Sequence, residues 1–323
     1  MLVVKNISAK EGDIVGTLKG KDILHGNQFS RKEIDAIMTT ASEFEKELKK
    51  KDALTLLKGK VLATLFFEPS TRTRLSFETA MQRLGGGVIS MASGESSSAA
   101  KGETVADTAR TVSQYADLMV IRHPRIGSAK EAANAADIPV INAGDGAGQH
   151  PTQALLDVYT IKKELGSLKN LTIAMVGDLK NGRTVHALVE LLSQFGARLY
   201  FVSPGLLRMP QEIISQLKQK GIEMVETEDL KEAASECDLI YMTRIQKERF
   251  EVPSDYERVK GSYVINEGFL KGLKKNITIL HPLPRVDEIS PGVDGYPGAA
   301  YFRQVRNGVF VRMALLAMIM GKK

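Results

Sequence analysis

The chain contains very little cysteine, and this scarcity limits the chemistry open to it. Cys237 is the one cysteine among 323 residues. A single thiol can build neither an internal disulfide framework nor a metal site with several cysteine ligands. We therefore expect no metal site of this kind and take the cytoplasm as the default location.

Long apolar runs are absent too. No uninterrupted stretch approaches the ~18–20 apolar residues that cross a bilayer. The N-terminal segment MLVVKNISAKEGDIVG turns polar after four residues, which is unlike a secretory signal peptide. We expect no membrane association.

The sequence also lacks a basic run interleaved with aromatic residues. The formal net charge is +6, which raises the possibility of nucleic-acid binding. However, the lysines and arginines are scattered, and many arginines stand in short motifs punctuated by glycine or proline. This pattern favours small anionic ligands over a nucleic-acid backbone, so we expect no nucleic-acid partner.

Short apolar runs alternate with longer segments of helical periodicity. Segments such as 30–50 and 151–165 have the periodicity of helices. The runs that favour strands are VLATLFF, DLMVIRH, IPVIN, LTIAMVG, RLYFVS, DLIYMT, YVIN and ITILH. This alternation predicts an α/β fold with two doubly wound domains, each built on a central parallel sheet flanked by helices.

A glycine-rich segment, NAGDGAGQHPTQ, separates two such series of strands and helices. A chain of this length suggests two domains, and we place them at 1–150 and 151–307. The apolar segment at 308–323 follows both series. The pattern itself does not decide which domain this segment covers; we expect it to rejoin the first.

Polar and cationic residues follow six of the apolar runs. Ligands of open α/β sheets bind outside the carboxyl ends of the strands. The segments found there are EPSTRTR, RHPR, AGDGAGQHPTQ, DLKNGRT, TRIQKER and HPLPR. Six such ends together indicate an anion-binding active site in the cleft between the two domains.

The segment EPSTRTR is the most informative of the six. Pro69 breaks the strand, and Ser70 or Thr71 can cap the following helix, whose free N–H groups favour an anion. The hydroxyl of Thr73 and the planar guanidinium of Arg72 add donors suited to phosphate. A simple cap beside surface arginines explains the segment about equally well on physical grounds.

The segment GDLKNGRT nearly matches the phosphate-binding loop GxxxxGK[ST], but Arg183 replaces the lysine. An ATP-binding loop needs that lysine and an acid that holds magnesium. Asp178 is the acid within the segment. Two hypotheses follow: a nucleotide-binding protein, or an arginine that binds a different anion.

Three separated motifs resemble the aspartate/ornithine carbamoyltransferase family over nearly the whole chain: FFEPSTRTRLSFE, HPTQ and HPLPR. Members that use ornithine typically carry HPCQ, HCLP and an SMG element, whereas this chain has MTRIQKER and no SMG. The resemblance therefore implies use of aspartate. The expected enzyme transfers the carbamoyl group of carbamoyl phosphate to the α-amine of L-aspartate. The products are N-carbamoyl-L-aspartate and phosphate, early in de novo pyrimidine biosynthesis.

The resemblance also implies which residues bind carbamoyl phosphate. Catalytic roles fall to Arg72, Thr73, Arg122 and His150, because cations and donors stabilise a developing oxyanion. Departing phosphate would take the amine's proton, so no protein base, metal or organic cofactor is implied. We interpret His123 and His186 as structural. The implied contacts are Ser70, Thr71, Arg72, Thr73, Arg122, His150 and Gln153, with the backbone carbonyls of Pro282 and Leu283.

Aspartate brings two carboxylates, so its site needs fixed cations. Arg183 and Arg244 provide them, with Gln246 as a neutral partner. Glu68 and Arg249 are supporting candidates. For each arginine the alternative is a surface ion pair, which contributes little.

The segment SGESSSAAKGETVAD has the composition of a flexible surface loop. In the family this loop crosses to a neighbouring chain and completes its active site. Ser97 and Lys101 match that pattern, so the resemblance implies a homotrimer with shared active sites. Whether regulatory chains join the trimer stays open.

Overall fold

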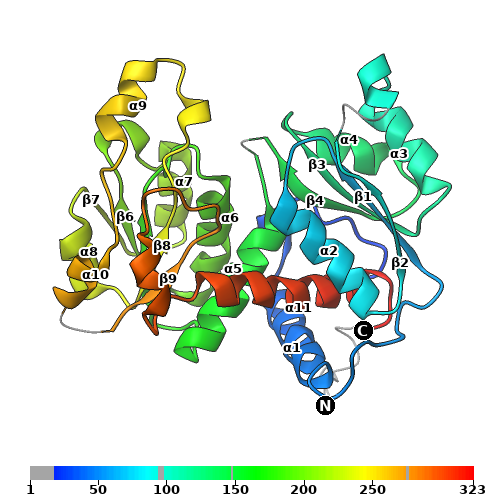
Figure 1. The fold of residues 1–323 in the computed structure, drawn as a ribbon, viewed down its shortest axis with the longest axis horizontal. Coiled ribbons are helices and arrows are strands. Elements are labelled where there is room, and N and C mark those ends of the chain that lie inside the picture. Colours follow the sequence, from blue (N-terminus) through cyan, green and yellow to red (C-terminus); the bar gives the residue numbers. More distant parts are fainter. Residues whose placement is uncertain (1–17, 94–97, 147, 274–275) are drawn as a thin grey trace, which may run out of the picture.

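Two parallel β-sheets organise the computed structural model, which describes residues 18–93, 98–146, 148–273 and 276–323. Figure 1 shows them side by side. The four-stranded sheet has the order β2-β1-β3-β4 and the five-stranded sheet the order β7-β6-β5-β8-β9, with every pairing parallel. The expected fold class is therefore confirmed. The strands are β1 Val61–Phe66, β2 Gly87–Met91, β3 Leu118–His123, β4 Val140–Asp145, β5 Thr172–Val176, β6 Arg198–Val202, β7 Met224–Thr227, β8 Leu239–Met242 and β9 Thr278–Leu280.

Helices connect successive strands and cover the sheets, as parallel pairing requires. The α-helices are α1 Arg31–Glu47, α2 Thr71–Arg83, α3 Val105–Ser113, α4 Ser128–Ala135, α5 Pro151–Leu165, α6 Arg183–Leu192, α7 Gln211–Gln219, α8 Leu230–Glu236, α9 Pro253–Val259, α10 Glu267–Lys271 and α11 Tyr301–Ile319. Short 3₁₀ turns are η2 Gly26–Gln28, η3 Ser98–Lys101, η4 Ser193–Phe195, η5 Gly205–Leu207, η6 Lys247–Arg249 and η7 Pro291–Gly295.

Local sequence explains where several helices begin. The Ser30 side chain accepts from the backbone N–H of Glu33, and the Glu33 carboxylate accepts from the backbone N–H of Ser30. Helix α1 therefore starts with a capping box. The side chains of Asp229 and Asn266 cap α8 and α10 by accepting from backbone N–H groups of the first turn. Pro151 occupies the first turn of α5, where its missing N–H costs nothing.

The strand order creates a switch point in each sheet. In the first sheet the chain moves outward from β1 to β2 and then returns to β3 on the other side. In the second sheet the corresponding pair is β5 and β8. Crevices outside the carboxyl ends of such strand pairs are the usual ligand sites of doubly wound sheets. The fold thus places one such crevice on each sheet.

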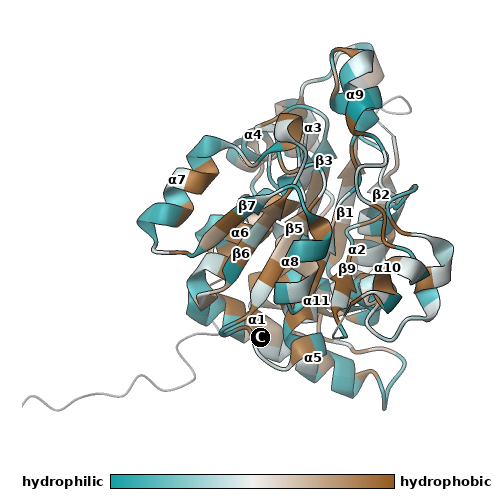
Figure 2. Ribbon diagram, turned by 90° about the vertical axis from the view of Figure 1, so that its left-hand side faces the viewer, coloured by the Kyte–Doolittle hydropathy of each residue, from teal (hydrophilic) through white to brown (hydrophobic). Residues whose placement is uncertain are grey.

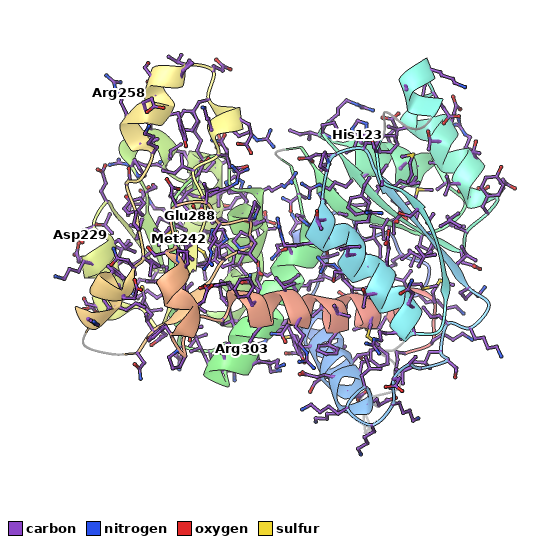
Figure 3. The ribbon with its side chains drawn as sticks, in the orientation of Figure 1. His123, Asp229, Met242, Arg258, Glu288 and Arg303 are labelled. Carbon is purple, nitrogen blue, oxygen red and sulfur yellow. The ribbon has the colours of Figure 1, made fainter. Side chains whose placement is uncertain are left out.

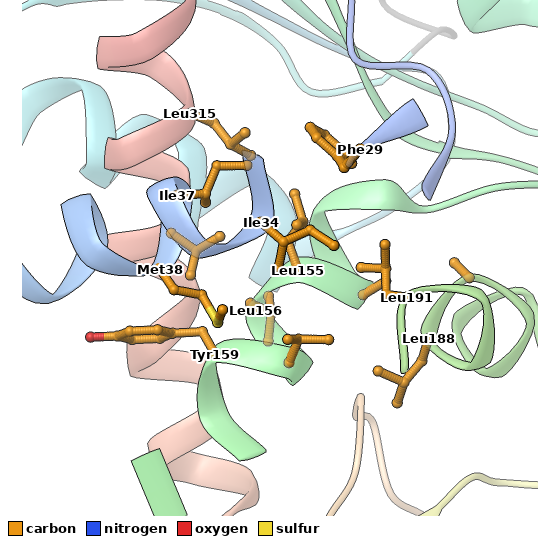
Figure 4. Close-up of a cluster of buried hydrophobic side chains, with 14 of the residues drawn as sticks. Phe29, Ile34, Ile37, Met38, Leu155, Leu156, Tyr159, Leu188, Leu191 and Leu315 are labelled. Atoms are coloured by element: carbon orange, nitrogen blue, oxygen red, sulfur yellow. The ribbon is translucent and has the colours of Figure 1, made fainter. Parts of the chain in front are cut away.

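A shared apolar core lies below these crevices. Helices α5 and α11 pack against each other, and α5 also packs against α6 beside the second sheet. Figure 4 shows part of this core, where Ile34, Leu155, Leu188 and Leu315 come together from α1, α5, α6 and α11. In Figure 2 the inner strands carry much of the brown, apolar colour, whereas α9 is mostly teal.

Helix α11 packs against α1, α2 and α5, which precede the second sheet in the chain. Figure 1 shows α11, in red, running from beside β9 of the second sheet to below the first sheet. We continue to propose that residues 1–150 and 151–307 form the two domains and that 308–323 rejoins the first. No helix in the described part of the chain is long and apolar enough to cross a membrane.

Candidate active site

A cleft of about 560 Å³ opens at the carboxyl ends of both sheets. It receives residues from all six strand ends that the sequence pattern singled out. Six arginines and two glutamates line it, so its walls are strongly cationic. The lining residues are Glu68, Pro69, Ser70, Thr71, Arg72, Thr73, Ser76, Arg122, His150, Gln153, Leu156, Gly182, Arg183, Thr184, Thr243, Arg244, Gln246, Glu248, Arg249, His281, Pro282, Leu283, Pro284, Gln304, Val305 and Arg312.

The start of helix α2 forms one wall of the cleft. Ser70 is the N-cap residue, yet its side chain makes no capping bond to the first turn. The first-turn N–H groups of an α-helix have no partner within the helix and favour an anion. Thr73 is buried in this turn, whereas Arg72 is exposed to the cleft. Burial and the nearby Arg122 and Arg244 lower the pKa of Arg72.

Glu68 lies between two half-buried arginines, Arg122 at the end of β3 and Arg183 at the start of α6. Its Oε1 is 3.3 Å from Arg122 Nη2, and its Oε2 is 3.8 Å from Arg183 Nη1. Burial lowers the pKa of Arg183 to about 10, and the charge of Arg122 acts in the same direction. One carboxylate therefore holds two guanidinium groups together across the cleft.

Gly144 supplies the space for this close approach. A Cβ atom at Gly144 would lie 3.2 Å from Arg122 Nη1 and 3.3 Å from Arg183 Cζ. Its φ of +118° is also a conformation that side chains rarely allow. A glycine at the end of β4 thus allows both cations to enter the cleft.

His150 is the N-cap residue of α5 and is buried. Its Nδ1 atom has no hydrogen-bond partner in the described part of the chain. Burial holds its pKa well below the usual value, and the charges of Arg183, Arg122 and Arg312 add to this effect. The ring is therefore neutral and leaves a polar atom free for a ligand.

The second sheet contributes Arg244 and Gln246 from the segment after β8. Arg244 forms a bidentate pair with Glu248, in which Nη1 lies 3.1 Å from Oε2. Gln246 donates from Nε2 to the Asn181 carbonyl at 3.3 Å, which ties this segment to the turn after β5. Arg249 lies in the same wall.

The segment after β9 has an unusual backbone. Leu283 adopts a φ of +56°, and the Leu283–Pro284 peptide bond is cis. The N–H of Leu283 donates to His281 Nδ1 at 2.7 Å, so His281 Nε2 carries the proton that faces Glu288 at 2.6 Å. This arrangement fixes Pro282 and Leu283 at the edge of the cleft.

One predicted residue stands outside this cleft, and another cannot be placed. Lys101 is exposed and does not line it, and Ser97 lies outside the described residues. Asp178 is buried and accepts bonds from the backbone N–H and side-chain amide of Asn181, so the turn itself uses its carboxylate. His123, labelled in Figure 3, accepts from the Arg125 N–H at 3.0 Å.

Several cleft residues were not expected from the sequence. Ser76 and Gln304 are neutral and gave no distinct signal, whereas Thr184 and Thr243 belong to the segments DLKNGRT and TRIQKER but were not assigned a role. Arg312 had a distinct signal, because it is a lone cation in the apolar segment VFVRMALLAMIM. It is buried on α11 and donates from Nη1 to Ser76 Oγ at 2.9 Å.

Comparison with known families identifies both parts of the chain. Residues 21–163 match "Aspartate/ornithine carbamoyltransferase, carbamoyl-P binding domain", and residues 169–319 match the "Asp/Orn binding domain" of the same family. The chain belongs to the aspartate/ornithine carbamoyltransferase family.

Individual relatives agree with this assignment. The chain is 54% identical over 303 residues to the aspartate carbamoyltransferase catalytic subunit of Thermococcus onnurineus, covering 94% of this chain and 98% of the relative. It is 53% identical over 302 residues to the chloroplastic aspartate carbamoyltransferase of Arabidopsis thaliana, covering 93% and 77%.

Solved structures share the fold. Aspartate transcarbamoylase from Trypanosoma cruzi, in complex with N-(phosphonacetyl)-L-aspartic acid, superposes with a TM-score of 0.90 at 45% identity, covering 94% of this chain and 97% of that one. The catalytic subunit of the M. jannaschii enzyme gives a TM-score of 0.87 at 52% identity, covering 93% and 98%.

Proposed function

We infer that this chain is an aspartate carbamoyltransferase. It transfers the carbamoyl group of carbamoyl phosphate to the α-amine of L-aspartate and yields N-carbamoyl-L-aspartate and phosphate, an early step of de novo pyrimidine biosynthesis. The observation that carries this inference is the cationic cleft, where the uncapped start of α2 meets arginines from both sheets. Such a cleft suits two anionic substrates that repel each other in solution.

We propose that carbamoyl phosphate binds the first-sheet side of the cleft. Its phosphate lies against the start of α2 and the side chains of Ser70, Thr71, Arg72 and Thr73. Arg122, His150 and Gln153 reach the carbamoyl end, where the carbonyls of Pro282 and Leu283 accept from the amide. The open first turn of α2 and the unpartnered Nδ1 of His150 support this placement.

Aspartate then enters from the second-sheet side. Arg183 and Arg244 bind its carboxylates, with Gln246 as a neutral donor. The neutral α-amine attacks the carbamoyl carbon, and Thr73, Arg122 and His150 stabilise the oxyanion. The bond from this carbon to the phosphate oxygen breaks, and the departing phosphate takes the amine's proton. No protein base is needed to remove this proton.

A turnover assay tests the function. Purified protein is incubated with carbamoyl phosphate and either L-aspartate or L-ornithine, and the carbamoylated amino acid is quantified. Carbamoyl-aspartate is the expected product. Citrulline would overturn the assignment of the second substrate but keep the phosphate site. The absence of both products would overturn the proposed function.

The proposal extends to assembly and location. We propose a homotrimer in which Ser97 and Lys101 of one chain complete the site of its neighbour, and a cytoplasmic location. The exposure of Lys101 on η3 is compatible with such a contact. Sedimentation with and without added regulatory chains would measure the assembly. Activity that persists in a monomeric sample would contradict shared sites.

A further inference from the structure

A buried carboxylate below the cleft receives three hydrogen bonds from different elements. Asp157, on α5, is fully buried. Its Oδ1 accepts from Gln153 Nε2 at 2.8 Å and from Gln304 Nε2 of α11 at 2.6 Å. Its Oδ2 accepts from the Tyr241 hydroxyl of β8 at 2.7 Å. The carboxylate thus joins the first and second halves of the molecule beneath the site.

An ionised carboxylate only accepts hydrogen bonds, and this fixes the direction of its partners. A glutamine side chain keeps nearly the same shape when its amide is flipped, so its hydrogen bonds decide the positions of Oε1 and Nε2. Because Gln153 gives its Nε2 to Asp157, its Oε1 is the atom left for the cleft. The cleft therefore meets an acceptor at Gln153 rather than a second donor.

The same carboxylate orients a second element of the cleft through Gln304. With its Nε2 on Asp157, Gln304 presents Oε1 to the backbone N–H of His281, which donates at 3.0 Å. His281 in turn accepts from the Leu283 N–H, and its Nε2 meets Glu288, which is labelled in Figure 3. The segment with Pro282 and Leu283 is therefore tied to Asp157 through one buried side chain.

We propose that Asp157 is the positioning residue for recognition of the carbamoyl amide. It turns Gln153 so that Oε1 faces the substrate NH₂, and through Gln304 it holds the Pro282–Leu283 segment as the second acceptor. This role rests on the proposed function. Asp157 does not touch the reacting atoms, and it acts by setting two acceptors that distinguish an amide from groups without N–H donors.

A pair of ligands isolates this role. Acetyl phosphate has a methyl group where carbamoyl phosphate has its amide nitrogen, so it shares the phosphate contacts but offers no N–H. The dissociation constant of each compound is measured by calorimetry at about pH 8, above the pKa of about 7 to which burial raises Asp157. The ratio of the two constants reports amide recognition alone.

Asp157→Leu is expected to weaken carbamoyl phosphate about fivefold more than acetyl phosphate, which is the loss of one oriented neutral hydrogen bond. Asp157→Asn should rescue the ratio, because its Oδ1 still accepts from both glutamines while the Tyr241 hydroxyl can accept instead of donating. An unchanged ratio in Asp157→Leu, whether or not both ligands bind more weakly, would overturn the proposal.

Thr160→Val is the matched control. Thr160 lies one turn further along α5 and accepts from Asn307 Nδ2 of α11 at 3.0 Å, a buried bond between the same two helices that does not reach the cleft. Its ratio should equal that of the unmodified protein. A shifted ratio in Thr160→Val would show that any loosening of α5 against α11 has this effect, and would overturn the specific role of Asp157.

Gln304→Leu tests the link from Asp157 to the Pro282–Leu283 segment in a variant that keeps Asp157 and two of its donors. We expect about a threefold loss of discrimination, because the Pro282–Leu283 segment loses its link. An unchanged ratio would overturn this part of the proposal even if Asp157→Leu does not fold. Failure of the proposed function is separate: unmodified protein would then bind neither ligand or yield no carbamoyl-aspartate.

Discussion

The two sides of the cleft present their cations differently. On the first-sheet side, Arg72 stands at the start of α2, and no carboxylate in the described part of the chain lies within ion-pair distance of it. On the second-sheet side, Arg183 faces Glu68 and Arg244 is held by Glu248. We call Arg72 and the start of α2 the open side, and Arg183 and Arg244, each with a carboxylate partner, the partnered side. Arg122 of the first sheet shares Glu68 with Arg183.

This difference bears on the order of binding. A phosphate can meet Arg72 and the start of α2 without displacing any carboxylate of the described residues. A substrate carboxylate that binds Arg183 or Arg244 has to share or replace Glu68 or Glu248, respectively. We therefore favour a sequence in which carbamoyl phosphate binds first and aspartate second.

The largest expected effect is on the open side. Arg72→Ala should lower kcat by about 10²–10³-fold, because it removes a charged donor aimed at the phosphate and reacting group. Steady-state kinetics at saturating substrates measures this loss. Arg83→Ala, at the other end of α2, is the control and should stay near normal. Near-normal turnover in Arg72→Ala would contradict the assignment of this side to carbamoyl phosphate.

The partnered side should respond mainly in substrate affinity. Arg244→Ala is expected to raise the Michaelis constant for aspartate by about 10–100-fold, the usual range for a hydrogen bond to a charged group. The dissociation constant of carbamoyl phosphate should stay nearly constant. Arg258→Ala on α9, labelled in Figure 3, removes an exposed arginine from the same region as a control. Equal weakening of both substrates would remove the distinction between the two sides.

Glu68 joins the two sides, so its removal should affect both. Glu68→Gln leaves Arg122 and Arg183 close together without their shared anion. We expect kcat/KM for aspartate to fall about tenfold, as for loss of a charged hydrogen bond. Glu131→Gln, whose carboxylate pairs with Arg125 on the surface, is the matched control. The same kinetics in both variants would show that Glu68 does not organise the arginines.

The smallest effect concerns His150 and the pH dependence of stability. Its folded pKa lies well below the usual 6.5, so as pH falls below 6.5 the unfolded chain takes up a proton that the folded chain does not. The His150 contribution to the free energy of unfolding should therefore decline by about 1.4 kcal/mol per pH unit. His150→Gln should lack this decline, so the difference in free energy of unfolding between the two proteins should shrink as the pH falls.

Denaturant titrations at about pH 7 and pH 5.5 measure that difference. His25→Gln removes an imidazole from the surface and serves as the control. Parallel pH dependences of unmodified protein and His150→Gln would mean that His150 can be protonated in the folded state. The cationic surroundings from both sides would then exert less influence on this ring than their positions indicate.

The sequence pattern located the buried strands better than the exposed strands. The strands β2 and β7 lie at the outer edges of their sheets and are mostly not buried, so they lack the continuous apolar runs that mark central strands. Conversely, YVIN was expected to be a strand, but it contributes only an isolated bridge between Ile265 and Ile289. Apolar runs report burial, and not every buried run pairs along its length.

The sequence by itself determined which segments face the cleft. Strand ends such as EPSTRTR and DLKNGRT are local features, and parallel pairing brings the carboxyl ends of strands to one edge of each sheet. It also determined the chemical type of the site, because arginines and hydroxyl groups stand at those ends.

Only the tertiary structure decided which of these groups meet. Glu68 reaches Arg122 and Arg183 from a distant part of the chain. Asp157 looked like one polar position on a core helix, yet packing of α5, α11 and β8 surrounds it with three donors. Burial removes water as an alternative partner, so buried polar groups must find one another. Those pairings follow from packing between distant segments, which no local pattern encodes.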